Sequence, residues 1–177
     1  MMSIKIIGNK IILKSLEKED AEKLYIYSKE PKLNEYSGPY KASKSVEDAK
    51  EYITKCNENM KKKISYHFGI YLKESEELVG VIGFFNLDEK NKKGEIGFWV
   101  AKDYWNNGYM SEAVKLFNDY IFDEVGYNKI YACFHELNKA VEKILLKSGY
   151  KKEKEIENAL LTDGKYYKDI IYEINNL

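Results

Sequence analysis

The sequence predicts an α+β domain in which a twisted, mostly antiparallel sheet of about seven strands is flanked by about four helices. Runs of β-branched and aromatic residues follow one another with only polar turns between them, which is typical of antiparallel strands. Elsewhere, apolar residues recur at the spacing of helices that bury one face. The 177 residues are few enough for one domain, so we expect residues 1–177 to form a single unit.

The first third of the chain predicts one strand and two helices. Residues 10–14 (KIILK) read as a strand, and residues 17–28 (EKEDAEKLYIYS) read as a helix with acids in its first turn. An irregular stretch follows over residues 32–44. Ser45 then has the character of an N-cap, which predicts a second helix that runs to about Met60.

The middle of the chain predicts a meander of three antiparallel strands. Residues 66–72 and 78–87 are β-branched and aromatic runs separated by the polar turn KESEE. The charged turn DEKNKK then leads into a strand over residues 95–100. Since short polar turns join neighbouring antiparallel strands, we expect these segments to pair in sequence order.

The last part of the chain predicts alternating helices and strands. The expected elements are a helix over about 107–122, a strand over 129–134, a helix over 139–148, and strands over 150–160 and 166–174. Gly149 stands where a glycine commonly ends a helix. Asp163 and Gly164 form the Asp-Gly pair of a β-hairpin turn.

The composition of the chain excludes several classes of function. Lysine plus arginine and aspartate plus glutamate both total 29, so no net field attracts nucleic acid, and none is expected as a partner. Cys56 and Cys133 match no metal-ligand spacing, so we expect no metal. The N-terminal residues lack the apolar run of a signal peptide, and no apolar run approaches the roughly 20 residues of a membrane helix. We therefore expect a cytoplasmic protein with no membrane partner.

A strand that leads through a glycine turn into a helix lies at residues 94–114 (GEIGFWVAKDYWNNGYMSEAV). The first amides of a helix have no backbone partner and the helix dipole favours negative charge, so this junction predicts an anion site. The chain contains no arginine, so anions must be held by backbone amides or by lysine. Glu95, on the strand leading to the site, is a carboxylate within one strand length of the bound anion.

Three segments together resemble the GNAT superfamily of N-acetyltransferases, in particular its ribosomal-protein-alanine and spermidine acetyltransferase branch. Residues 104–113 (YWNNGYMSEA) resemble the pyrophosphate loop of that family, although Met110 replaces its usual small residue. The asparagine segment of the family is similar to residues 138–150 (NKAVEKILLKSGY). Its substrate-side loop and helix are similar to residues 37–53 (SGPYKASKSVEDAKEYI). The resemblance covers nearly the whole chain, and it implies the GNAT fold and acetyl-CoA as co-substrate.

The resemblance also implies which residues contact acetyl-CoA. The backbone amides expected to hold the pyrophosphate are those of Asn107, Gly108, Tyr109, Met110 and Ser111. The strand backbone expected beside the pantetheine arm is that of Phe98, Trp99 and Val100. Asn138 matches the family asparagine that hydrogen-bonds the pantetheine, and simple N-capping of the following helix is an equal alternative. The resemblance further implies a substrate pocket lined by Glu35, Tyr36 and Tyr40.

Acetyl transfer to an amine needs a base, and Glu95 occupies the position of the glutamate base in related enzymes. Its alternative role is that of a sheet glutamate paired with Lys92 or Lys93. The usual donors of a proton to the departing thiolate are replaced by Leu145 and Val141, neither of which can donate one. Either water supplies this proton, or a tyrosine such as Tyr131, Tyr166 or Tyr167 supplies it, or the chain has lost its activity.

We therefore expect an N-acetyltransferase that moves an acetyl group directly from acetyl-CoA to a primary amine in a ternary complex. The amine belongs to a small molecule or a peptide N-terminus, and the sequence does not distinguish them. The alternative is an acyl-CoA-binding sensor of the same fold without catalytic activity, which the replaced proton donors favour. A homodimer formed through the C-terminal hairpin is a further expectation, based on its aromatic residues Tyr166 and Tyr167.

Overall fold

The computed structural model describes residues 4–31, 43–162 and 164–176. Its centre is an eight-stranded sheet with the strand order β1-β2-β3-β4-β5-β6-β8-β7. All neighbouring strands are antiparallel except β5 and β6, which run parallel. The strands are β1 (Lys5–Ile7), β2 (Ile11–Lys14), β3 (Tyr66–Leu72), β4 (Leu78–Asp88), β5 (Lys93–Val100), β6 (Lys129–His135), β7 (Lys151–Thr162) and β8 (Lys165–Asn175).

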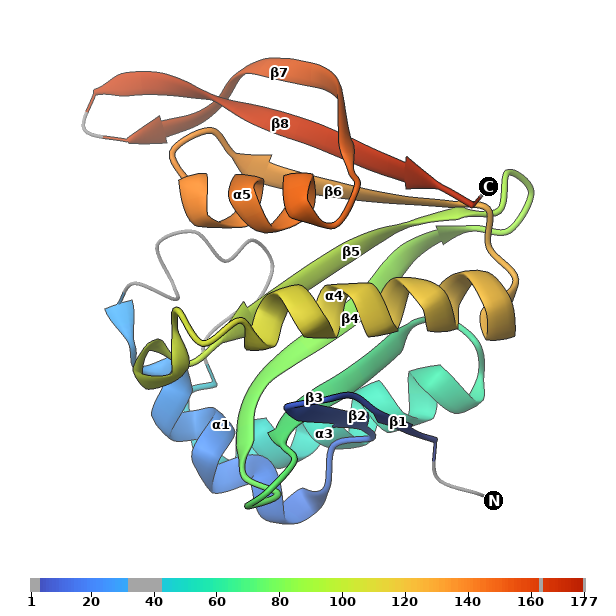
Figure 1. The fold of residues 1–177 in the computed structure, drawn as a ribbon. Coiled ribbons are helices and arrows are strands. Elements are labelled where there is room, and N and C mark those ends of the chain that lie inside the picture. The colour runs from blue at the N-terminus through green and yellow to red at the C-terminus, as the bar shows by residue number, and fades with distance from the viewer. Residues whose placement is uncertain (1–3, 32–42, 163, 177) are drawn as a thin grey trace.

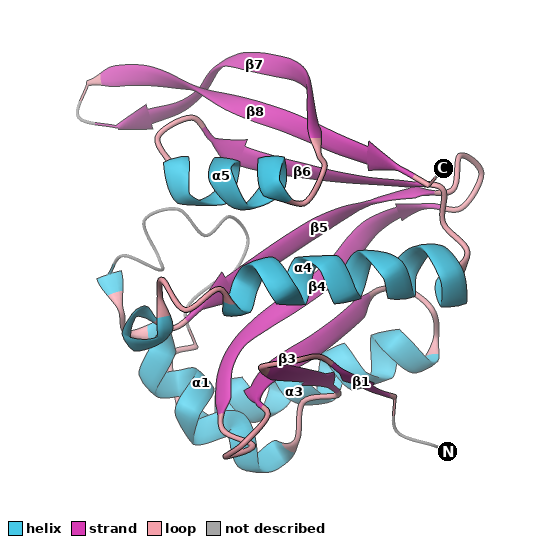
Figure 2. Ribbon diagram, viewed as in Figure 1, coloured by secondary structure: helices cyan, strands magenta, loops and turns pink. Residues whose placement is uncertain are grey.

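Helices cover both faces of this sheet (Figure 2). The α-helices in the described residues are α1 (Ala21–Ser28), α3 (Val46–Lys61), α4 (Tyr109–Tyr120) and α5 (Lys139–Lys147). Two 3-10 turns, η1 (Lys18–Asp20) and η2 (Lys102–Tyr104), precede α1 and α4, and a π-helical turn, η3 (Ile121–Val125), continues α4. None of the helices in the described ranges is long and apolar enough to span a membrane.

Each face of the sheet has its own apolar core. The core under α4 and α5 contains Phe117 and Leu145 together with the β5 residue Ile96. The core under α1 and α3 contains Leu24 and, from the other face of β5, Trp99. Because successive side chains of a strand point to opposite faces, β5 contributes to both cores. Burial of both sheet faces fixes the strand register, since a slip of one residue would exchange the two faces.

Local signals predicted the helix boundaries that the structure shows. Ser45 caps α3, because its hydroxyl accepts a hydrogen bond from the Asp48 amide at 3.1 Å. Gly149 follows α5 with φ of +87°, a left-handed conformation that glycine adopts without steric cost. The predicted α+β class and mostly antiparallel sheet are thus confirmed. Asp163 lies outside the described residues, and the strands on either side of it, β7 and β8, pair as expected.

Two parts of the fold differ from the expectation. The three-residue strand β1 was not predicted, although Gly8 and Asn9, which follow it, form a possible hairpin turn. The predicted first helix begins with the 3-10 turn η1, so its α-helical part starts only at Ala21. Both differences concern short, weakly periodic segments whose conformation depends on tertiary pairing.

Candidate active site

Strands β5 and β6 are paired only near their beginnings, which leaves a gap in the hydrogen-bonded strand pairing of the sheet. Their paired positions are Lys93 with Lys129, Gly94 with Ile130, and Glu95 with Tyr131. Beyond Glu95 the two strands diverge towards the start of α4 (Figure 1). From Glu95 to Val100 the open side of β5 extends roughly 16 Å at about 3.3 Å per residue. The notch, as we call this gap between β5 and β6, therefore closes at Glu95 and Tyr131.

The mouth of the notch is the end at which β5 and β6 finish. The chain passes from β5 through η2 into α4, and from β6 through a short turn into α5. The N-termini of both helices therefore follow directly from the strands that border the mouth. Helix N-termini carry partial positive charge, so this end of the notch favours an anionic ligand.

The start of α4 presents free backbone amides to the mouth. Gly108 is the N-cap residue, with φ of +79°, and no described side chain caps this helix start. The first hydrogen bond of the helix runs from the Glu112 amide to the Gly108 carbonyl at 3.1 Å. The amides of Tyr109, Met110 and Ser111 precede it and have no acceptor within the helix. This arrangement can hold a phosphate through the backbone, as the sequence predicted for an arginine-free chain.

We call the backbone amides of residues 107–111 the cradle. The side chains of these residues contact the protein around it. Met110 is buried in the core under α4, and Tyr109 packs against that core. The Asn107 side chain donates back to the carbonyls of Tyr104 and Trp105 at 3.1 and 3.0 Å. The contribution of these positions to ligand binding is therefore expected from their backbone, and the unusual Met110 side chain points away from the mouth.

Lys10 contacts the cradle, and the sequence did not predict this contact. Its ammonium group donates to the Asn107 carbonyl at 3.1 Å and lies 3.9 Å from the position of a Cβ built on Gly108. Glu112 holds the turn that carries Lys10, since its carboxylate accepts hydrogen bonds from the backbone amides of Asn9 and Lys10. The two segments are about a hundred residues apart, so only the β1–β2 hairpin packing against α4 brings this cation to the mouth.

The closed end of the notch contains Glu95 and the polar groups beside it. The Asn86 side-chain amide donates to Glu95 Oε2 at 2.8 Å, and the Tyr131 hydroxyl lies close enough to the same carboxylate for the two groups to influence each other's pKa. Burial raises the pKa of Glu95 above its ordinary value, against the opposing effect of these two neighbours. A raised pKa suits a carboxylate that must take a proton near neutral pH. Lys92 instead pairs with Glu89 at 2.7 Å, so the sheet ion pair that was the alternative for Glu95 does not involve Lys92.

Asn86 was also missed by sequence reasoning. It has φ of +51° in a stretch where the register between β4 and β5 shifts, between Phe85 and Asp88. Such an irregularity redirects a side chain from its normal strand face. A positive φ at an asparagine is a local feature, but nothing in a single sequence marks the residue it will reach.

The side chains of the β5 residues beyond Glu95 pack into the two cores, so their expected contact with the coenzyme stays a prediction about their backbone. Trp99 is buried and meets the Tyr27 ring edge-on at a centroid distance of 6.0 Å, while Val100 is buried in the opposite core. Phe98 is half-buried against that same core. The Val100 carbonyl accepts a 2.7 Å hydrogen bond from the Trp105 indole, which fixes the path of the chain towards the cradle.

Asn138 caps α5. Its Oδ1 accepts a hydrogen bond from the Val141 amide at 3.2 Å, which is the structural role that the sequence left as an alternative. The Asn138 side-chain NH₂ group is a separate donor at the mouth, so a contact to the coenzyme stays a prediction compatible with capping.

The candidate tyrosines and the positions of the usual proton donors are widely dispersed. Leu145 is fully buried in the core under α4 and α5, and Tyr166 is 63% exposed on the C-terminal hairpin. Tyr167 packs against His135 with ring centroids 5.4 Å apart. Desolvation and the carboxylates of Asp169 and Glu95 raise the pKa of the Cys133 thiol to about 11, which disfavours a nucleophilic thiolate. Glu35, Tyr36 and Tyr40, the predicted substrate residues, lie outside the described part of the chain.

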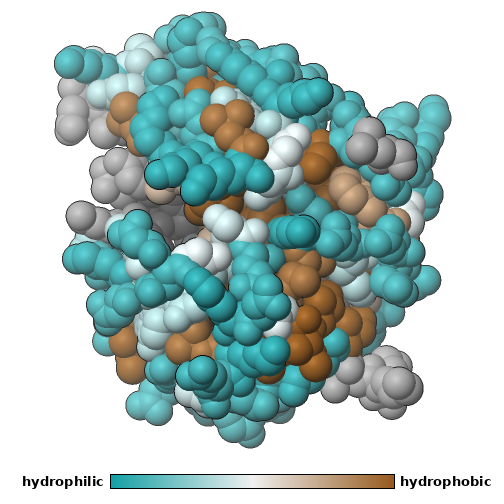
Figure 3. Space-filling view, in the orientation of Figure 1, coloured by the Kyte–Doolittle hydropathy of each residue, from teal (hydrophilic) through white to brown (hydrophobic). Residues whose placement is uncertain are grey.

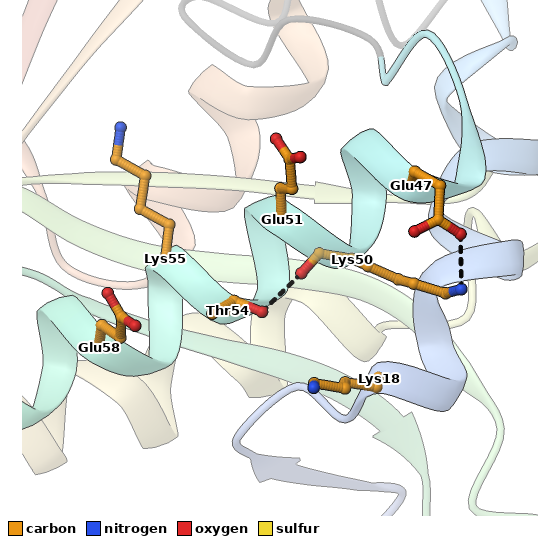
Figure 4. A pocket seen from close by; sticks show the side chains of 7 residues that line it. All are labelled: Lys18, Glu47, Lys50, Glu51, Thr54, Lys55 and Glu58. Atoms are coloured by element: carbon orange, nitrogen blue, oxygen red, sulfur yellow. Dashed lines mark hydrogen bonds and ion pairs between the residues drawn. The ribbon is translucent and has the colours of Figure 1, made fainter.

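Two surface hollows lie away from this site. One, of about 390 Å³, lies along α3 and is lined by charged groups such as Glu47 and Lys50, which pair at 2.7 Å (Figure 4). The other, of about 400 Å³, lies between β1 and α4. Hydrophilic groups cover much of the face in front of α4, with apolar groups showing in smaller patches (Figure 3). Neither hollow includes Glu95 or the cradle, so neither changes the location of the candidate site.

Comparison with known proteins places this geometry in a family. Residues 10–151 match the family described as "Acetyltransferase (GNAT) domain". The chain is 28% identical over 166 residues to the uncharacterized N-acetyltransferase YoaA of Bacillus subtilis, covering 94% of this chain and 93% of that protein.

Two solved structures share the fold. RimL, a ribosomal L7/L12 α-N-protein acetyltransferase in complex with coenzyme A, superposes with a TM-score of 0.87 at 15% identity, covering 97% of this chain and 98% of RimL. The microcin C7 self-immunity acetyltransferase MccE, in complex with acetyl-CoA and AMP, superposes with a TM-score of 0.81 at 21% identity, covering 96% and 94%. The family match spans most of the chain, and this chain therefore belongs to the GNAT family of acetyl-CoA-dependent N-acetyltransferases.

Proposed function

We propose that the protein transfers an acetyl group directly from acetyl-CoA to a primary amine bound in the same complex. The observation that carries this proposal is the arrangement of the notch between β5 and β6. Its mouth offers the free amides of α4 to a pyrophosphate, and its closed end holds Glu95, a carboxylate with a raised pKa. A coenzyme with its phosphates at the mouth and its acyl group inside the notch would present the thioester near this base.

The proposed role of each residue follows from its place in the notch. The amides of residues 107–111 bind the pyrophosphate, with Lys10 adding a positive charge. The backbone of Phe98, Trp99 and Val100 lies beside the pantetheine arm, and an amide there polarises the thioester carbonyl. Asn138 hydrogen-bonds the arm from the β6 side while it caps α5.

Glu95 acts in this proposal as the general base, directly or through a water molecule. Alkyl amines are mostly protonated at neutral pH and must lose a proton before they attack. Because burial raises the pKa of Glu95, the carboxylate accepts this proton more readily than an exposed one. The rate should fall as the pH decreases through the pKa of Glu95, because the protonated acid no longer acts as a base.

The substrate is proposed only as a primary amine, of a small molecule or of a protein N-terminus. RimL is named for acetylating a ribosomal protein, and the structure of MccE contains AMP beside acetyl-CoA, so proteins of this fold accept different acceptors. Glu47, an acid that a polycation pocket would use, instead pairs with Lys50 on the outer side of α3. This pairing weakens the case for a polyamine relative to a monoamine or a peptide.

Thiol release from acetyl-CoA, measured with a panel of amines and N-terminal peptides, tests the proposal. Glu95→Gln should lose most of the rate, on the order of 10²- to 10⁴-fold as for other general bases, with unchanged coenzyme binding by calorimetry. Glu153→Gln, on the exposed edge strand β7, is the matched control and should keep the wild-type rate. Normal turnover by Glu95→Gln would exclude Glu95 as the base.

A second candidate function is an acyl-CoA sensor that binds the coenzyme without turning it over. It is favoured by one observation: Leu145, at the position of the usual proton donor, is fully buried in the core. Calorimetry with acetyl-CoA followed by the amine panel separates the two functions. Binding without turnover of any amine supports the sensor, and absence of binding contradicts both.

A further inference from the structure

Acetyl transfer requires two proton movements, and the structure so far accounts for one. The N–C bond forms as the amine attacks the thioester, and the C–S bond breaks as the coenzyme thiolate departs. One proton must leave the amine nitrogen, and one must reach the sulfur. Glu95 takes the first, whereas the positions that resemble the family's donors are the aliphatic residues Leu145 and Val141. Leu145 has no exposed surface at all, so the notch cannot reach it.

Tyr131 is the hydroxyl that the fold places beside Glu95. The two residues form the last pair between β5 and β6, so they stand on either side of the point where the notch closes. Their strand neighbours Ile96 and Ile130 are buried in the core under α4. Side chains alternate along a strand, so Glu95 and Tyr131 both project from the opposite face of the sheet, where the two side chains are neighbours across the strands.

The electrostatic surroundings of Tyr131 keep its hydroxyl protonated. Burial raises its pKa, and the negative charges of Glu95 and Asp88 act in the same direction, as does the Cys133 thiol on the same strand. On the Glu95 side the hydrogen-bonding partner is the neutral Asn86. Burial raises the pKa of Cys133, the next residue after Tyr131 on the same face of β6, and the positive charge of Lys154 opposes this effect. The hydroxyl is thus a proton donor throughout the physiological pH range.

We propose, resting on the acetyl transfer proposed above, that Tyr131 is a catalytic residue which gives its hydroxyl proton to the departing coenzyme thiolate and is reprotonated by Glu95. Once the ammonium proton has passed through Glu95 to solvent, the neutral amine attacks, and one of its N–H protons moves to the Glu95 carboxylate as the N–C bond forms. The Tyr131 proton moves to the sulfur as the C–S bond breaks, and the new proton on Glu95 passes to the Tyr131 oxygen beside it. The net result is the transfer of one proton from nitrogen to sulfur, and both residues return to their starting state.

The other hydroxyl and thiol groups considered for this step are worse placed. Tyr166 is largely exposed on the hairpin of β7 and β8, and Tyr167 packs against His135, the last residue of β6. Cys133 shares the face of Tyr131 but lies past the last pair of β5 and β6, where the strands have separated. Among the described residues, Tyr131 is the hydroxyl that the strand register pairs directly with Glu95.

Tyr131→Phe tests the relay, with Tyr166→Phe as the matched control. The Tyr131→Phe variant should lose on the order of 10- to 100-fold in kcat, less than the usual effect of a general acid because a thiol of pKa about 8.5 is a fair leaving group. KM for acetyl-CoA and the midpoint of thermal unfolding should stay near the wild-type values. The control should match the wild type in all three measurements. Tyr131→Leu provides a second hydroxyl-free variant if the phenylalanine protein is unstable.

A proton inventory separates catalysis from a structural effect. In mixtures of H₂O and D₂O, and with the slowest amine that is turned over, the wild-type kcat should curve with the D₂O fraction because more than one proton moves. In Tyr131→Phe the plot should become linear. Wild-type kcat in the variant, or an unchanged curved plot, would overturn the relay. Absence of turnover by the wild type with every amine would instead contradict the acetyl transfer itself, so the two failures are distinguishable.

Discussion

Gly108 offers the sharpest test of the cradle at the mouth of the notch. Its φ of +79° is left-handed, and a built Cβ meets only the Lys10 ammonium, at 3.9 Å. An alanine there would therefore fit sterically within the protein but would strain the backbone by about 1–2 kcal/mol. At roughly 2–4 °C per kcal/mol for a chain of this size, Gly108→Ala should lower the midpoint of thermal unfolding by roughly 2–8 °C.

The same substitution should weaken coenzyme binding separately from this strain. The new methyl group and the shifted backbone would disturb the amides of Tyr109 and Met110, which have no acceptor within the helix. Loss of one hydrogen bond to a charged group costs about 1.5–3 kcal/mol. Since about 1.4 kcal/mol is tenfold in affinity, calorimetry with coenzyme A should show a dissociation constant raised on the order of 10- to 100-fold.

Gly126→Ala is the matched control for Gly108→Ala. Gly126 has nearly the same backbone conformation, with φ of +82° and no atom within 4 Å of a built Cβ, but it follows η3 at the far end of α4. It should lower the unfolding midpoint by a similar amount and leave coenzyme affinity unchanged. Wild-type affinity in both variants would refute the cradle, and an equal large loss in both would show that the effect comes from general destabilisation.

Three further predictions concern Glu95, Asn138 and Leu145. Because burial raises the pKa of Glu95, the folded state binds the carboxyl proton more tightly than the unfolded chain does, and the resulting stabilisation is present at low pH and lost as the pH rises through the raised pKa. Glu95→Gln should therefore unfold at or above the wild-type temperature at pH 7. Thermal scans should show the difference in unfolding temperature closing below the ordinary carboxyl pKa. A Glu95→Gln protein less stable than the wild type at pH 7 would contradict this sign. Asn138→Ala should lose about 1 kcal/mol of unfolding free energy because the α5 cap is removed, whereas Asn138→Ser should keep the cap. Calorimetry should show that both variants bind coenzyme A more weakly than the wild type. Full affinity in Asn138→Ser would mean that Asn138 only caps the helix. Leu145→Tyr, which puts a hydroxyl at the position of the usual proton donor, should cost about 1–3 kcal/mol of unfolding free energy by overpacking a fully buried site, and it should bring no gain in kcat. A faster enzyme would show that position 145 reaches the notch.

Local sequence patterns were enough to predict most of the secondary structure. The Ser45 cap, the polar turns of the meander and Gly149 after α5 act within a few residues, so they are legible in one sequence. The glycine turn at Gly108 and the carboxylate at Glu95 were equally visible, and their separation along one strand and one turn fixed their approximate distance. The family resemblance added a ligand to this geometry, and the comparisons confirmed the family.

Only the tertiary structure decided which groups surround these two residues. Asn86 reaches Glu95 through an irregularity between β4 and β5, and Lys10 reaches the cradle from a hairpin about a hundred residues away. Tyr131 was one of three candidate tyrosines until the parallel register of β5 and β6 placed it opposite Glu95. A sequence shows the preferences of each segment for helix, strand or turn, because those depend on neighbours in the chain. The partners of a side chain depend on register and packing between distant segments, which the folded chain alone determines.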